Sequence, residues 1–137
     1  MTRILVVDDD PDIRYAVAAL LIDAGYEVAS AANGLEAFAE IQAHRPDAVL
    51  LDLTMSVMDG WAFLEAIRVQ PRLRGVPIGV LSGAHDASKA EQEPAVWAVI
   101  PKPFAVDSLL DTVEALVKHS IVRRGGTGDR AGPSAAA

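Results

Sequence analysis

The chain is 137 residues long and 51% hydrophobic, which is enough for a single domain with one buried core. Its 19 acidic residues outnumber its 12 lysines and arginines, and the formal net charge of -7 argues against electrostatic binding to nucleic acid or anionic lipid. The chain has no cysteine, which excludes disulfides, thiolate metal sites and cysteine nucleophiles. Without a signal-like or membrane-length apolar run, we expect a cytoplasmic protein that contacts no membrane and does not bind DNA directly.

Strand-like and helix-like stretches alternate along the chain. Five short, mostly apolar segments are typical of strands buried on both faces: 3–7, 27–31, 48–52, 77–81 and 96–100. Apolar residues at helical spacing lie between or after them: Ile13, Val17, Leu20 and Leu21; Leu35, Phe38 and Ile41; Phe63, Leu64 and Ile67; Leu109, Leu110, Val113, Leu116 and Val117. The alternation predicts an α/β fold, doubly wound, with a five-stranded parallel sheet and helices on both faces.

Two stretches do not fit this simple alternation. The segment 84–97 should contain a fourth helix, but Pro94 cannot sit inside one, so we expect that helix to be short or distorted. Beyond His119 the sequence turns to glycine, alanine and arginine without an apolar period. We therefore expect a domain over residues 1–119, a flexible tail over residues 120–137, and no output domain in the chain.

Polar residues stand where the predicted strands end. Three aspartates at 8–10 follow the first strand, Asp52 ends the third, Ser82 follows the fourth and Lys102 follows the fifth. The carboxyl ends of parallel strands share one edge of the sheet, and ligands of open α/β sheets bind there. We therefore expect these side chains to form one site.

The chemistry of this set favours a cation and an anion together. Neighbouring carboxylates raise each other's pKa, which a hard divalent ion relieves, and Mg²⁺ fits with Asp9 and Asp52 as ligands and Asp8 acting through water. Lys102 and Ser82 are suited to an incoming anionic group. These groups predict a phosphoryl-transfer pocket, and with no cysteine and no histidine expected there, a carboxylate is the predicted nucleophile.

The stretches "ILVVDDDPDIR", "PDAVLLDLTMSVMDG", "VLSG" and "PKPF" resemble, in this order, the receiver domain of bacterial two-component response regulators. The similarity covers roughly residues 2–118. It implies the sheet order 2-1-3-4-5, a cis peptide bond between Lys102 and Pro103, and phosphorylation of the aspartate that ends the third strand, Asp52. The donor would be a sensor histidine kinase or a histidine phosphotransfer protein.

The resemblance also implies a role for each matching position. Asp8 and Asp9 would hold Mg²⁺, and the backbone carbonyl of Thr54 would complete the metal ligands. Ser82 would supply the hydroxyl that moves to the phosphoryl group, and Lys102 matches the lysine of the family pattern. Such a domain catalyses only its own phosphorylation and dephosphorylation, and is not an enzyme in the usual sense.

Some positions depart from the family pattern, and these leave an alternative open. Val99 stands where an aromatic switch residue is common, and Pro94 alters the fourth helix, so the output face differs. A pseudo-receiver that binds a downstream protein without phosphate is therefore the alternative function. A phosphohydrolase is disfavoured because Thr54 stands where a second acid is needed. In either signalling function the downstream partner is an unknown protein.

Overall fold

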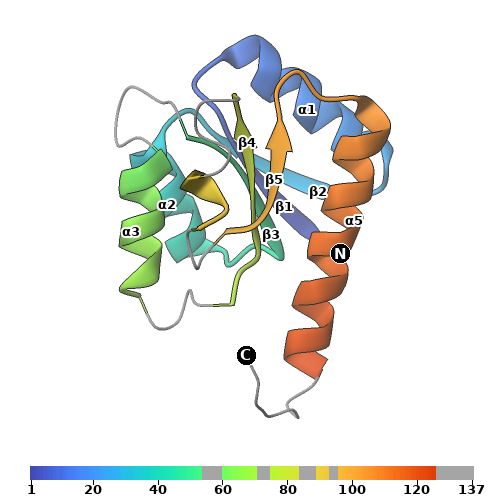
Figure 1. Ribbon diagram of the computed structural model, residues 1–137. Coiled ribbons are helices and arrows are strands. Elements are labelled where there is room, and N and C mark those ends of the chain that lie inside the picture. The colour runs from blue at the N-terminus through green and yellow to red at the C-terminus, as the bar shows by residue number, and fades with distance from the viewer. Residues whose placement is uncertain (54–59, 71–74, 84–88, 93–95, 126–137) are drawn as a thin grey trace.

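A computed structural model describes residues 1–53, 60–70, 75–83, 89–92 and 96–125, with side chains up to residue 119. Five parallel strands form one sheet in the order β2-β1-β3-β4-β5 (Figure 1). The strands are β1 (Arg3–Val7), β2 (Glu27–Ala31), β3 (Ala48–Asp52), β4 (Ile78–Ser82) and β5 (Val96–Pro101). The predicted α/β class and the 2-1-3-4-5 order are confirmed.

Four helices among the described residues cover the two faces of the sheet: α1 (Pro11–Asp23), α2 (Gly34–Ala43), α3 (Gly60–Arg68) and α5 (Val106–Gly125). Figure 1 shows α1 and α5 on one face and α2 and α3 on the other. Local sequence explains where the first two begin. Asp10 caps α1, with Pro11 at the first helical position, and Asn33 caps α2 through a bond from the backbone N–H of Glu36.

The central strands carry a hydrophobic core on each side. In β1, Ile4 and Val6 pack into the cluster made with α1 and α5, whereas Leu5 and Val7 pack into the cluster made with α2 and α3. Both faces of β1 and β3 are therefore buried, as their apolar runs predict. The same expectation is wrong for β2 and β5, which are partly exposed because each lies at an edge of the sheet.

The predicted apolar face of α2 also needs a correction. Leu35 is 56% exposed, while Gly34, Ala37 and Ile41 are buried. These buried positions follow the spacing of one helix face from the first residue of α2, which turns Leu35 towards solvent.

Some boundaries differ from those expected. The fourth strand runs one residue later than predicted and includes Ser82, whose carbonyl accepts a hydrogen bond from the Lys102 N–H at 2.8 Å. Helix α5 continues past position 119 to Gly125, because no glycine or proline interrupts residues 120–124. Residues 126–137 lie outside the described residues, as does most of the fourth-helix segment, of which Lys89 and Ala90 are helical. Within the described chain, no helix combines the length and apolar character needed to cross a membrane.

Candidate functional site

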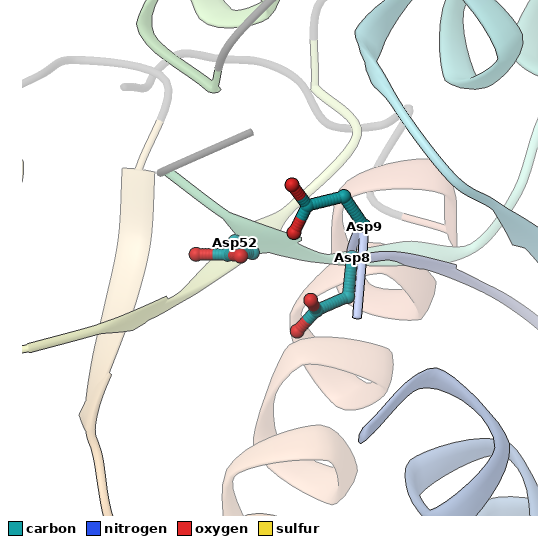
Figure 2. Close-up of side chains that lie close together, drawn as sticks. All are labelled: Asp8, Asp9 and Asp52. Atoms are coloured by element: carbon teal, nitrogen blue, oxygen red, sulfur yellow. The ribbon is translucent and has the colours of Figure 1, made fainter. Parts of the chain in front are cut away.

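Three aspartates meet at the carboxyl ends of the two central strands β1 and β3. Val7 and Leu51 are partners in the parallel ladder, so the residues that follow them, Asp8 and Asp52, emerge side by side. Asp9 comes next along the chain, and the carboxylates of Asp8, Asp9 and Asp52 approach within 4.8 Å of one another (Figure 2). The predicted convergence at one edge of the sheet is thus present for Asp8, Asp9 and Asp52, whereas the Asp10 side chain caps α1 instead of joining them.

Burial makes this cluster electrostatically unfavourable. Asp8 is completely buried and Asp52 is 6% exposed, whereas Asp9 is exposed. Burial raises the pKa of the Asp8 carboxyl above its ordinary value of 3.8, and the nearby charge of Asp52 raises it further. The backbone N–H of Asp10 donates to Asp8 Oδ1 at 3.0 Å and favours the charged form. The ionised state of Asp8 is therefore less stable here than in water.

Lys102 and Ser82 join the same edge of the sheet. The Lys102 ammonium lies 3.5 Å from Asp52 Oδ1 and 3.7 Å from Asp8 Oδ2, so it faces both buried carboxylates. Ser82 is buried, and its hydroxyl donates to the carbonyl of Gly83 at 2.9 Å. The Lys102–Pro103 peptide bond is cis, as the sequence resemblance implies. Thr54, the remaining predicted site residue, lies outside the described residues.

The donor set fits a hard cation. Asp8 Oδ2 is buried and has no hydrogen-bond partner within the described residues; the Lys102 ammonium lies 3.7 Å away, beyond hydrogen-bond distance, and a buried carboxylate oxygen is unfavourable unless charge compensates it fully. The cluster offers carboxylate oxygens, which Mg²⁺ and Ca²⁺ prefer. The aspartates can therefore hold a divalent cation, and Lys102 can meet an anionic group beside it.

Gly60 has a structural role at this site that the sequence interpretation missed. A Cβ atom at position 60 would lie 2.5 Å from the Leu53 Cα and 2.8 Å from the Asp52 carbonyl oxygen, so only glycine lets α3 begin so close to the end of β3. The next residue, Trp61, is partly buried, and the Lys89 ammonium lies 4.8 Å from the centre of its ring. The "DG" that follows the predicted strand was the available signal for this close approach.

Arg14 was also missed. Its side chain donates to the backbone carbonyl of Asp8 at 2.8 Å, from the first turns of α1 back to the end of β1. A contact to a backbone carbonyl has no sequence signature, because every residue carries that acceptor. Its position one turn after the Asp10 cap was the only available hint.

Comparison with known proteins places these features in a family. The family model described as response regulator receiver domain matches residues 4–114. The transcriptional regulatory protein PrrA of Mycobacterium tuberculosis is 38% identical over 127 residues, covering 91% of this chain and 52% of that protein. The response regulator Rre1 of a Synechocystis strain is 33% identical over 135 residues, covering 96% of this chain and 57% of Rre1. The chain thus spans about half the length of these curated relatives.

Solved structures show the same fold. The chemotaxis response regulator CheY4 of Vibrio cholerae aligns with a TM-score of 0.77 and 37% identity, covering 85% of this chain and 98% of that one. NtrX from Brucella abortus, in complex with ADP, aligns with a TM-score of 0.84 and 31% identity, covering 97% of this chain and 31% of NtrX. The family match over residues 4–114 includes the edge of the sheet where the carboxylates meet.

Proposed function

The chain belongs to the family of response regulator receiver domains of two-component systems, and on this premise we propose that Asp52 accepts a phosphoryl group from a phosphohistidine donor. The observation that carries the proposal is the placement of the Asp52 carboxylate. It ends a central strand beside two further carboxylates, with the Lys102 ammonium 3.5 Å from its Oδ1. This arrangement supports a nucleophilic carboxylate set among groups that hold an anion.

The transfer step follows from this placement. A carboxylate oxygen of Asp52 forms a bond to phosphorus while the P–N bond to the donor histidine breaks. The bonding pair leaves with the imidazole nitrogen, which then takes up a proton. The product is an aspartyl phosphate on Asp52, and the donor is a sensor histidine kinase or a histidine phosphotransfer protein. The protein thus catalyses its own phosphorylation and acts as a signalling domain.

The metal of this reaction is proposed to be Mg²⁺, held by Asp8, Asp9 and Asp52. The backbone carbonyl of Thr54 is added from the family pattern, since that residue lies outside the described residues. When bound, Mg²⁺ neutralises charge on the carboxylates and on the phosphoryl oxygens. The buried Asp8 Oδ2, which has no hydrogen-bond donor in the described chain, supports a cation at this place.

Lys102 and Ser82 are proposed to act on the phosphoryl group. Lys102 already faces Asp8 and Asp52, so its charge meets the anion as it arrives. The Ser82 hydroxyl donates to the Gly83 carbonyl here, and a phosphoryl oxygen on Asp52 would offer it a charged acceptor instead. Exchange between these two acceptors gives two conformations whose populations phosphorylation shifts.

We place the protein in the cytoplasm, with its phosphorylated form acting on a downstream protein, and we propose a receiver domain over residues 1–119 whose last helix, α5, extends to Gly125 before the tail. The acidic net charge of -7 argues against direct binding of this chain to DNA or to a membrane. The relatives named as transcriptional regulatory proteins are about twice as long, so this expectation concerns only the chain described here.

Intact-mass measurement after incubation with Mg²⁺ and acetyl phosphate tests the function directly. We expect one added phosphoryl group on the wild type, none on Asp52→Asn, and none when EDTA precedes the donor. Asp12→Asn, which changes an exposed aspartate of α1, is the matched control and should be labelled like the wild type. An unlabelled wild type that still binds Mg²⁺ would contradict the proposal and favour a phosphorylation-independent binding module.

A further inference from the structure

The turn between β1 and α1 holds the acidic pair through its backbone. The Arg14 guanidinium donates to the carbonyl oxygen of Asp8 at 2.8 Å. That carbonyl belongs to the peptide that joins Asp8 to Asp9, so the contact fixes the plane from which the Asp9 side chain projects. Among the residues that the structure describes, no group hydrogen-bonds the Asp9 carboxylate, so the backbone sets where its side chain starts and the rotamer alone sets the rest.

Further contacts fix the position of Arg14 itself. The Asp10 side chain caps α1 by accepting from the backbone N–H groups of Asp12 and Ile13, at 2.9 and 3.4 Å. The Arg14 N–H donates to the Asp10 carbonyl at 2.9 Å, which closes the first helical turn. The start of α1 thus fixes the backbone position of Arg14, and from there its guanidinium reaches back to the end of β1.

The acceptor that Arg14 uses distinguishes positioning from charge compensation. An arginine that neutralised the acidic cluster would pair with its carboxylates, as Arg3 pairs with Glu40 at 2.8 Å elsewhere in the fold. Within the described residues Arg14 forms no such ion pair, and its side chain donates to a carbonyl instead. Arg14 therefore leaves the carboxylates of Asp8 and Asp9 unoccupied by its own charge.

We propose that Arg14 is a positioning residue that orients the Asp8–Asp9 peptide for Mg²⁺ binding, an inference that rests on the proposed function. A role in charge and a role in positioning predict opposite effects of removing Arg14 on Mg²⁺ affinity. A cation beside the site repels Mg²⁺, so loss of the charge alone would tighten Mg²⁺ binding. Loss of the hydrogen bond frees the peptide and weakens binding, because contacts that orient metal ligands control affinity. The sign of the change therefore separates the two roles.

The test is a Mg²⁺ titration, read by thermal unfolding, of the wild type and three variants of position 14. We expect Arg14→Ala to weaken Mg²⁺ binding about tenfold. Arg14→Gln, which keeps a donor without the charge, should bind more tightly than Arg14→Ala, and Arg14→Lys should recover part of the affinity. If the alanine variant does not fold, the Mg²⁺ affinities of the glutamine and lysine variants are compared with that of the wild type instead, and both should be weaker. At saturating Mg²⁺ the phosphorylation rate of each variant should return close to that of the wild type.

Arg68→Ala is the matched control, because it removes the same charge from an exposed pair with Glu65 at the end of α3. Its Mg²⁺ affinity should stay close to that of the wild type. If Arg14→Ala binds Mg²⁺ as tightly as the wild type or more tightly, or if Arg68→Ala weakens binding equally, the positioning role is overturned. A wild type that binds no Mg²⁺ would instead overturn the proposed metal site, so the two failures are distinguishable.

Discussion

The two ends of the sheet carry charge clusters of similar composition and opposite character. At the amino ends, Arg3 pairs with Glu27 at 3.5 Å and with Glu40 at 2.8 Å, and its backbone N–H donates to Asp47 at 2.9 Å. At the carboxyl ends, Lys102 faces carboxylates at 3.5 and 3.7 Å. Each cluster combines one of these cations with three carboxylates.

The two clusters differ in their burial and in their hydrogen bonding. The side chains of Arg3 and Glu40 are 24% and 31% exposed, and the guanidinium supplies several donors in a fixed geometry. Asp8 and Asp52 are almost fully buried, and Asp8 Oδ2 has no hydrogen-bond partner in the described chain. The amino-end cluster ties strands and α2 together, whereas at the carboxyl end two buried carboxylates and the exposed Asp9 face a single ammonium. Similar composition thus gives a hydrogen-bonded structural site at one end and, at the other, a cluster that could bind a cation.

The stabilisation that Mg²⁺ gives the folded protein should show the largest difference between variants of the two clusters. At a concentration one hundred times its Kd, a ligand that binds only the folded state stabilises it by about 2.7 kcal/mol. We expect Asp9→Asn to lose most of this stabilisation, because the exposed Asp9 is a proposed ligand. Glu40→Gln, at the amino end, should keep it in full. Thermal unfolding with and without Mg²⁺ measures the stabilisation of both variants. If Mg²⁺ stabilises Asp9→Asn as much as the wild type, Asp9 is not a ligand of the metal site.

Much of the fold was predictable because the central strands are apolar on both faces and the helical stripes alternate with them. The structure confirms this for β1 and β3, whose neighbouring residues enter opposite cores. Leu35 was assigned wrongly because the phase of a short helix depends on its first residue, and the start at Gly34 turns position 35 outward. A single residue of uncertainty at a helix start is enough to misplace a side chain.

The candidate site was predictable to the extent that topology dictates it. Parallel strands bring their carboxyl ends together, so Asp8, Asp52 and Lys102 could be grouped from the sequence alone. The contacts of Arg14 and Gly60 had only weak sequence signals, because both are made with backbone atoms that every residue carries. Sequence patterns identify reactive side chains, whereas the contacts that orient them become visible only in three dimensions.

Arg3→Ala should reveal the structural character of the amino-end cluster. Removing the guanidinium leaves the partly buried Glu40 without its closest cation, and hydrogen bonds to charged groups contribute about 1.5 kcal/mol or more. We expect urea denaturation to show a loss of about 1.5 kcal/mol that is the same with and without Mg²⁺. Arg68→Ala, in an exposed pair, should lose less than about 0.5 kcal/mol. An equal loss in both variants would show that the amino-end cluster contributes no more than a surface pair.

Asp8→Asn should have a smaller effect of opposite sign. The folded-state pKa of Asp8 lies above the ordinary value of 3.8, mainly because the carboxyl is buried, so the protonated carboxyl favours the folded state. That stability is present below about pH 3.8 and is lost as the pH rises through the folded pKa. Asparagine is neutral at every pH and can still accept from the Asp10 N–H, so it avoids the loss.

Without metal, we therefore expect Asp8→Asn to be more stable than the wild type by about 1 kcal/mol at neutral pH. The difference should shrink as the pH falls towards 3.8, because the wild-type carboxyl then becomes neutral as well. Urea denaturation in EDTA over a series of pH values measures this stability difference. Subtracting the stability curve of one protein from that of the other cancels the contribution of the acidic residues that both proteins share. A variant that is less stable at neutral pH, or a difference that does not change with pH, would mean that the ionised Asp8 is as well balanced as the carboxylates around Arg3.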